Sequence, residues 1–191
     1  MTHSAHDVAA EIRRRLPGVG AKKLHKLLYY CQGHHLAHFD MPLFTESVSA
    51  WDMGPVVGQL WHDERLQPGP RGHADLTEAE LNTIGFVISR YGALSGLDLE
   101  HLAHAEDPWL LADRDRPQGG SVRIERDWMR DYFRSIGDGH EDGEIWFEYE
   151  TVVALTVGAE QRLAAAGPPG PDQTDRLRAR LRELQGESPG V

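Results

Sequence analysis

The chain has 191 residues, of which 40% are hydrophobic and 26% are charged, and its formal net charge at pH 7 is −10. This length predicts one domain of ordinary size with an appendage, large enough to bury a core without disulfides or metal ions. The negative charge repels phosphate groups, which argues against nucleic acid as a partner.

The cysteine content and the hydropathy favour a cytoplasmic protein. Cys31 is the single cysteine, so no disulfide can form within the chain, and this suits a reducing compartment. Residues 1–15 lack the apolar stretch of a signal peptide, and no run of the chain is apolar enough to predict a membrane span. We therefore expect a cytoplasmic location and no membrane partner.

Two helices are predicted at the start of the chain. Residues 5–16 carry apolar side chains at intervals of four, and Pro17 ends this pattern. Residues 21–39 give the strongest helical pattern, because five side chains fall on one face of a 3.6-residue period. These side chains are Leu24, Leu27, Leu28, Cys31 and His35. We expect this face to belong to the core.

An extended segment and another helix are predicted next. Residues 47–51 alternate weakly between polar and apolar side chains, which predicts a short strand or an extended loop. Gly54 and Pro55 predict the start of a helix, because proline lacks an N–H that would be unsatisfied in a first turn. Trp61 in this helix is expected in the core.

Further helices are predicted between residues 77 and 136. Thr77 and Glu80 have the spacing of a capping box, in which each side chain bonds the backbone of the other residue. The helix that they open is expected to end near Tyr91, with Gly92 in a left-handed cap. The remaining helices are predicted over residues 94–105, from Pro108 onward, and over residues 124–136.

The character of the chain changes after Gly137. Residues 138–150 carry six acidic side chains and no lysine or arginine, with the aromatics Trp146, Phe147 and Tyr149 among them. This acidic-aromatic segment is a candidate surface for a basic protein partner, because complementary charge speeds encounter and fixes register. A solvated charged loop is the alternative interpretation.

Together these elements predict a mainly α fold, a compact bundle of about six helices with at most a small β-hairpin, followed by an appended C-terminal segment. We place the helical domain at residues 1–136. The acidic-aromatic segment and a helix packed on it follow at residues 137–166, and a Pro/Gly linker with a short amphipathic tail occupies residues 167–191.

Several short motifs follow one another in a fixed order. They are KLHKLLYY (23–30), QGHHLA (32–37), PLF (42–44), AW (50–51), GPVV (54–57), LAH (102–104) and PW (108–109). In this order they resemble the Panacea domain family, which includes SocA-like and GepA-like phage-associated proteins. The resemblance covers residues 5–136, and the family carries threonine where this chain has Ala103.

The resemblance implies an α-rich fold without enzymatic activity or a cofactor. Members of the family look like antitoxins of toxin–antitoxin pairs, so the implied partner is a cognate toxin, encoded by an adjacent gene and neutralised by direct protein–protein binding. One member looks like an adaptor that delivers its toxin to a AAA+ protease, which makes such a protease an alternative partner. The resemblance leaves open which mechanism applies.

The resemblance and the acidic-aromatic segment together supply the candidate partner-binding residues. They are Lys23, Tyr30, His35, Trp51, Gly54, Pro55, His104, Pro108, Trp109, Trp146, Phe147 and Tyr149.

The histidines leave another function open, that of a metal-dependent hydrolase. Cys31, His35 and His38 are spaced i, i+4, i+7, so a metal site on one helical face can be drawn. However, no paired metal motif such as H-E-x-x-H occurs, and two of these residues lie on the expected core face. Catalysis would also need a nucleophile and an orienting group beside His35 or His104. We therefore predict no catalytic, cofactor-binding or metal-binding residues.

Overall fold

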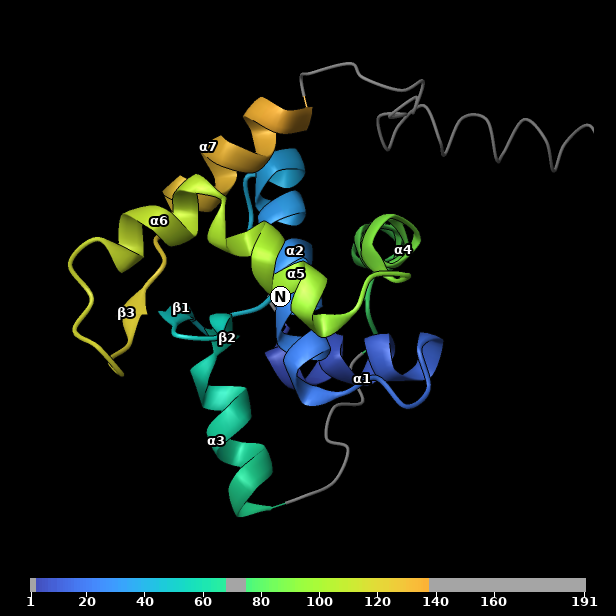
Figure 1. Ribbon diagram of the computed structural model, residues 1–191. Helices are drawn as coiled ribbons and strands as arrows, with labels where there is room; N and C mark the ends of the chain where they lie inside the picture. Colours follow the sequence, from blue (N-terminus) through green and yellow to red (C-terminus); the bar gives the residue numbers. More distant parts are fainter. Residues whose placement is uncertain (1–2, 68–74, 138–191) are drawn as a thin grey trace, which may run out of the picture. The chain divides into compact units, whose positions relative to one another are not determined.

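The computed structural model describes residues 3–67 and 75–137, which form seven helices and one three-stranded sheet (Figure 1). The helices are α1 (Ala5–Arg15), α2 (Ala21–Phe39), α3 (Gly58–Leu66), α4 (Glu78–Tyr91), α5 (Gly96–His104), α6 (Asp107–Asp113) and α7 (Arg126–Gly137). The strands are β1 (Val48–Trp51), β2 (Gly54–Val57) and β3 (Val122–Arg123). The predicted mainly α fold is confirmed, and the two-residue strand β3 extends the expected hairpin.

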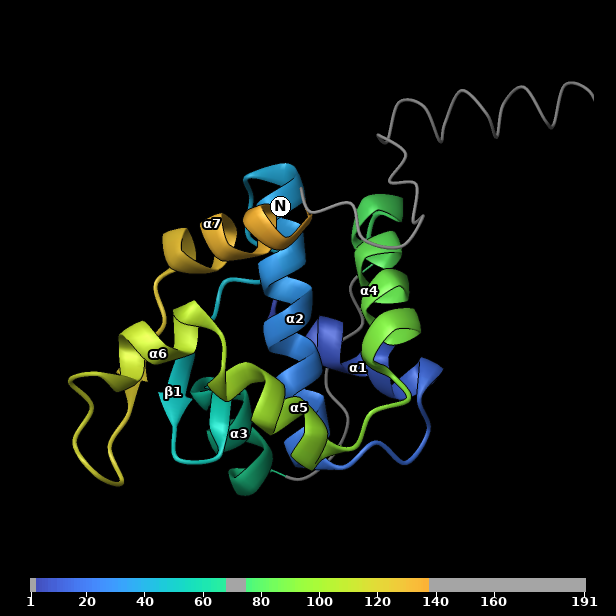
Figure 2. The same cartoon turned by 45° about the horizontal axis from the view of Figure 1, so that its top comes forward.

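Helix α2 is the central element of this domain. Every residue from Leu24 to Leu36 is buried, because α1, α4, α5, α7 and β2 all pack against it. Figure 2 shows α2 running between α4, α5 and α7. The sequence predicted one buried face, whereas a helix covered all round buries its polar side chains as well. Each of those polar groups then needs a partner inside the protein.

Gln32 and Gly33 show how α2 accommodates its neighbours. The Gln32 Oε1 accepts the backbone N–H groups of Leu43 and Phe44 at 2.9 and 3.2 Å, and its Nε2 donates to the Phe44 carbonyl at 3.1 Å. A Cβ at residue 33 would lie 2.2 Å from the Phe133 ring, so glycine lets α7 approach α2. These two residues therefore fix the loop after α2 and the seat of α7.

The end of α2 is closed by α7. Asp40 caps the helix in the left-handed conformation, with φ 54°. The Arg134 guanidinium donates two hydrogen bonds to the Ala37 carbonyl at 3.2 Å and pairs with the Asp40 carboxylate at 2.9 Å. A cation at this end of a helix also offsets the partial negative charge of the free carbonyls.

The sheet corrects the helix start predicted at Gly54 and Pro55. The strand order is β2-β1-β3 with antiparallel pairs, and Trp51 pairs with Gly54 across a tight turn. Gly54 has φ 86°, which a right-handed helix cannot use, and Pro55 lies in an edge strand, where its missing N–H costs no ladder hydrogen bond. The next helix, α3, therefore begins at Gly58. Of the two alternatives predicted over residues 47–51, a short strand or an extended loop, the structure shows the strand, at Val48–Trp51.

The helix ends confirm one predicted cap and correct another. Thr77 and Glu80 form the predicted capping box at the start of α4, and Ser4 and Ser95 open α1 and α5 in the same way. Helix α4 ends at Tyr91 as predicted, but Gly92 has φ −66° and remains right-handed. A Cβ there would lie 2.3 Å from the Ile88 carbonyl oxygen, so close packing explains this glycine.

Two further expectations concern the core and the ends of the chain. Trp61 is half-buried instead of fully in the core, and it packs edge-on against Trp51. Of the predicted organisation, the segments 137–166 and 167–191 lie outside the described residues, apart from Gly137. Within the described ranges, none of the helices combines the length and the apolar composition needed to cross a membrane.

Candidate functional site

A buried carboxylate, Glu106, lies between α5 and α6 and faces the central helix. The Tyr29 hydroxyl donates to Glu106 Oε2 at 2.8 Å, and the Tyr30 hydroxyl donates to Oε1 at 3.1 Å. Burial raises the pKa of Glu106 to about 7, although the hydrogen bonds from both tyrosines oppose this rise. The carboxyl group thereby joins α6 to α2.

Tyr30, a predicted site residue, extends this contact to α4. Its ring stacks on Tyr91 with centroids 4.1 Å apart, and the Tyr91 hydroxyl hydrogen-bonds His34 Nε2 at 3.1 Å. Burial lowers the pKa of His34 to about 3, so this imidazole is neutral at pH 7. The cluster formed by Glu106, Tyr29, Tyr30, Tyr91 and His34, which we call the carboxyl cluster, connects α2, α4 and α6.

Lys26 is a second buried charged residue against α5. Its side chain is 1% exposed, and its ammonium donates one hydrogen bond, to the Pro55 carbonyl at 3.1 Å. Burial lowers the pKa of Lys26 to about 8, an effect that the nearby Glu100 opposes. Within residues 3–67 and 75–137, no carboxylate forms an ion pair with Lys26.

Gly54 makes room for the Lys26 side chain. A Cβ at residue 54 would lie 2.8 Å from Lys26 Cε, 3.2 Å from Lys26 Nζ and 3.3 Å from His104 Nε2. The positive φ of Gly54 also favours glycine, which has no Cβ to clash with its own backbone. The backbone of β2 thus brings the nitrogen atoms of Lys26 and His104 to the same side of Gly54.

His104 and Trp109 complete this group, which we call the donor cluster: Lys26, Gly54, Pro55, His104 and Trp109. The two rings stack with centroids 4.0 Å apart, and burial lowers the pKa of His104. Pro108 in the first turn of α6, as predicted, leads directly into Trp109. His104 Nε2 and Trp109 Nε1 are buried, and neither has a hydrogen-bond partner among the described residues.

His35 lies apart from both clusters and has a structural contact. Its Nδ1 is 2.9 Å from the Thr83 hydroxyl oxygen. The Thr83 hydroxyl donates to the Ala79 carbonyl at 3.1 Å, so it accepts the hydrogen of His35 Nδ1. Burial lowers the pKa of His35 to about 4, and the neutral ring ties α2 to α4.

The other predicted residues lie at the edges of the domain. The Lys23 ammonium donates to the Gly92 carbonyl at 2.6 Å, after the end of α4. The half-buried Trp51 donates from Nε1 to the Ser121 hydroxyl at 2.9 Å, and its ring contacts Trp61. The structure therefore brings together only Gly54, Pro55, His104, Pro108 and Trp109 of the predicted set. Trp146, Phe147 and Tyr149 lie outside the described residues.

The helical pattern of Cys31, His35 and His38 does not assemble a metal site in the described part of the chain. No group of three histidine, cysteine or carboxylate side chains there has the geometry to hold an ion. Cys31 is fully buried, and burial raises the pKa of its thiol well above the usual range. His35 is held by Thr83, and His38 lies on the exposed side of α2.

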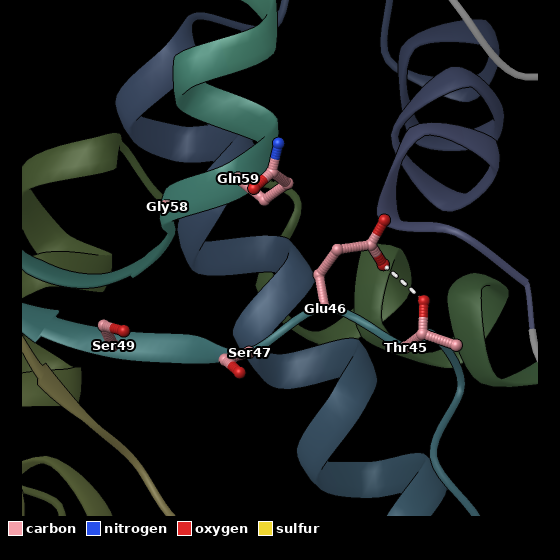
Figure 3. A pocket seen from close by; sticks show the side chains of 6 residues that line it. All are labelled: Thr45, Glu46, Ser47, Ser49, Gly58 and Gln59. Carbon is pink, nitrogen blue, oxygen red and sulfur yellow. Dashed lines mark hydrogen bonds between the residues drawn. The ribbon is translucent and has the colours of Figure 1, made fainter.

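A shallow polar pocket of about 350 Å³ lies away from both clusters, between the segment before β1 and the start of α3 (Figure 3). It is lined by Thr45, Glu46, Ser47, Ser49, Gly58 and Gln59. The Glu46 carboxylate turns toward Thr45 and accepts hydrogen bonds from the Thr45 hydroxyl at 3.2 Å and from the Ala5 N–H at 2.8 Å (Figure 3). The pocket holds no group that points to catalysis.

Sequence reasoning missed Lys26, Glu106 and Tyr29. Lys26 and Tyr29 stand inside the quoted motif KLHKLLYY, but an amphipathic interpretation assigns a lysine to the surface. Glu106 lies between the quoted motifs LAH and PW and belongs to neither. The motif KLHKLLYY itself could have revealed Lys26 and Tyr29, because its residues are consecutive and so lie on every face of the helix. A helix that is buried on every face must also bury the charged residues within it.

Comparison with known families agrees with the motifs. Residues 24–110, which span most of α2 and continue into α6, match the family described as antitoxin SocA-like, Panacea domain. The resemblance predicted from the sequence is thereby confirmed for this part of the chain. A search of the curated proteins and a search of the solved structures found no match. The Panacea match supports an antitoxin role in general, with a toxin as the general class of partner.

Proposed function

We propose that this protein is an antitoxin that neutralises a cognate toxin by binding it directly. The observation that carries the proposal is the Panacea match over residues 24–110, which includes the carboxyl cluster and the donor cluster. Helix α5 packs against α2, and Glu106 at the start of α6 bonds to Tyr29 and Tyr30 of α2. A surface that is preorganised by such contacts loses little conformational entropy on binding.

The exposed apolar side chains suggest where the toxin binds. Six of the large ones fall within the matched residues, namely Met41, Met53, Leu66, Leu97, Leu102 and Leu110. Three of these lie on the two consecutive helices that carry the LAH and PW motifs, Leu97 and Leu102 on α5 and Leu110 on α6. We place the toxin contact on these three leucines and call them the α5–α6 surface.

The size of the domain is compatible with tight binding. A nanomolar complex corresponds to about 12 kcal/mol. A stable interface of ordinary size buries about 800 Å² on each partner. The α5–α6 surface would form the apolar centre of such an interface, where a few side chains contribute most of the binding free energy.

The test is co-expression with the protein encoded by the adjacent gene, scored by growth and by co-purification. The wild-type protein should restore growth and co-purify with that toxin. The double variant Leu102→Asp/Leu110→Asp should lose both properties, because two buried charges at the interface centre would be unpaired. Leu66→Asp is the matched control, since Leu66 is 68% exposed on α3 and should tolerate the same change.

A harmless adjacent protein, or a toxic one whose effect persists without any complex, contradicts the proposal. If growth is restored only in cells that contain the protease, and the toxin disappears from those cells, the result would instead show delivery to a AAA+ protease. Purified components distinguish these mechanisms, because direct neutralisation needs no protease.

A further inference from the structure

Among the described residues, the polar nitrogens of the donor cluster have fewer hydrogen-bond partners than they can take. The Lys26 ammonium has three N–H groups and one hydrogen bond, to the Pro55 carbonyl, in the described part of the chain. His104 Nε2 faces the same side of Gly54, and the indole that stacks on His104 has an unpartnered Nε1. Trp109 is only 8% exposed, so this indole nitrogen is shielded from bulk water.

Such an arrangement is unusual, because at least nine in ten buried polar groups have a hydrogen-bond partner. A buried donor left without an acceptor costs about 1–3 kcal/mol. The carboxyl cluster on the same helix shows the ordinary situation, in which both carboxylate oxygens of Glu106 accept a hydrogen bond. No described residue supplies the corresponding acceptor to the donor cluster.

The charges around the cluster limit what the acceptor can be. Among the described residues Lys26 has no ion-pair partner, and Glu100, the acid whose charge acts on it, pairs with Lys22 at 2.6 Å. The Glu100 carboxylate still acts on Lys26 and His104, so a dianion such as phosphate would be repelled more than a single negative charge. A carboxylate has one charge and two oxygens, which suits one ammonium and one ring nitrogen.

We propose that Lys26 and His104, whose side-chain nitrogens lie on the same side of Gly54 and are backed by Trp109, form a binding site for a carboxylate group supplied from outside the domain. The site lies near the surface, since Met53 before Gly54 is 53% exposed and the His104 ring is only half-buried. The carboxylate can belong to an acidic side chain, to the C-terminus of another chain or to a free small molecule. This proposal does not depend on the antitoxin function.

A third ring nitrogen, His25 Nε2, is also buried without a partner among the described residues. The His25 ring accepts the Val57 N–H at Nδ1, and the charges of Lys26, Glu64 and Arg13 act on it. We do not include it in the proposed site, because no contact joins it to His104 or Trp109 in the described part of the chain.

The experiment is an NMR titration of the full chain at constant ionic strength, observing the Trp109 indole N–H and the His104 ring signals. The probes are acetate for a free carboxylate, N-acetylglycine for a chain terminus and N-acetylaspartate amide for a side chain, with chloride as the control. At least one carboxylate should shift both signals saturably, and chloride should not. The probe with the highest affinity identifies the source of the carboxylate.

Two variants test the named residues separately. Lys26→Met keeps the length of the buried stem and removes the ammonium, and His104→Phe keeps the stack on Trp109 and removes both nitrogens. Each should weaken binding of the best probe at least tenfold. Lys23→Met and His101→Phe are controls on the same two helices, because Lys23 bonds Gly92 and His101 is exposed.

Two results would overturn the proposal. One is the absence of a saturable shift with all three carboxylates, which would mean that ordered water alone satisfies these donors. The other is equal binding by wild type and by both Lys26→Met and His104→Phe. If one variant fails to fold, the other and the wild-type titration still decide the question.

Discussion

The two polar clusters that contact α2 differ in how completely their groups are paired. In the carboxyl cluster, Glu106 accepts one hydrogen bond at each oxygen, and Tyr30 stacks on Tyr91. In the donor cluster, Lys26 has one partner, and the ring nitrogens of His104 and Trp109 have none in the described residues. Both clusters lie inside the same family match, so membership of a motif does not by itself separate structural residues from binding residues.

The difference between the two clusters indicates which buried polar residues of α2 have a structural role and which can bind a ligand. A saturated cluster contributes stability and orientation, because its groups lose no hydrogen bonds on folding. An unsaturated cluster costs stability in the isolated protein and regains it when an acceptor binds. Removal of a polar group should therefore destabilise the protein in the carboxyl cluster but have little effect, or stabilise it, in the donor cluster.

The largest effect should come from Glu106→Ala. This change leaves the hydroxyls of Tyr29 and Tyr30 without their acceptor and creates a cavity, which together should lower the free energy of unfolding by about 3–4 kcal/mol. Urea denaturation followed by circular dichroism measures this. Glu125→Ala, at an exposed position before α7, should change stability by less than about 0.5 kcal/mol. Equal losses in both variants would show that Glu106 is not a structural anchor.

The pH dependence of stability should depend on the same carboxyl. Burial lowers the pKa values of His25, His34 and His35 to about 4, 3 and 4, so the unfolded chain holds more protons below pH 6.5, and stability falls as the pH falls. Glu106 acts in the opposite direction, because its pKa is about 7 in the folded protein and 4.5 in the unfolded chain. Its protonation stabilises the folded protein at low pH, and this stabilisation is lost as the pH rises from 4.5 to 7.

Glu106→Gln should therefore steepen the rise in melting temperature between pH 4.5 and 6.5. The variant removes the opposing contribution of Glu106 and leaves those of the three histidines. The stability change between pH 4.5 and 6.5 should therefore increase by up to about 3 kcal/mol. Thermal denaturation at several pH values measures the slope. Glu125→Gln is the control, and an unchanged slope in Glu106→Gln would show that Glu106 ionises normally in the folded protein.

Gly54→Ala should have an intermediate effect and disturb the donor cluster. A left-handed alanine costs about 1 kcal/mol, and the contact of its Cβ with Lys26 Cε at 2.8 Å adds to this, for a total of about 2 kcal/mol. Gly18→Ala separates the two terms, because Gly18 also has a positive φ of 81° but nothing within 4 Å of an added Cβ. Calorimetry that gives the same loss for both variants would rule out close packing at Lys26.

The smallest effect on stability is expected for Lys26→Met. Removal of a buried ammonium without an ion pair should change the free energy of unfolding by less than about 1 kcal/mol, or should stabilise the protein. This contrasts with Glu106→Ala in the other cluster. A loss of 3 kcal/mol or more in chemical denaturation would show that Lys26 is a paired structural residue, like Glu106.

Periodicity and capping patterns predicted most elements of this domain, but they could not predict the surroundings of α2. The bounds of α2 and the Thr77 capping box follow from local sequence, because both depend on residues a few positions apart. Lys26 and Glu106 are buried because α5, α6 and β2 pack around α2. Local sequence patterns carry no information on this packing. The helix start expected at Gly54 was wrong for the same reason, since a positive φ is set by pairing with β1.

Among the candidate residues, the family motif was the better predictor. It named Gly54, Pro55, His104 and Trp109, which do meet in space, although they are up to 55 positions apart. It also named His35 and Tyr30, whose hydrogen bonds are satisfied within the core. Structural residues and candidate binding residues differ in whether their side-chain nitrogen and oxygen atoms have hydrogen-bond partners. These partners are far apart in the sequence, so the three-dimensional structure is needed to identify them.

The central claim is that this protein acts by covering a toxin and not by transforming a substrate. The most direct measurement is a titration of the purified toxin, in a cell-free assay of the process that it inhibits, with increasing amounts of the purified protein. Binding predicts that inhibition ends at a fixed molar ratio of the two proteins and that this ratio does not change with incubation time. Neutralisation by substoichiometric amounts that increases with time would contradict the account, because it would require turnover.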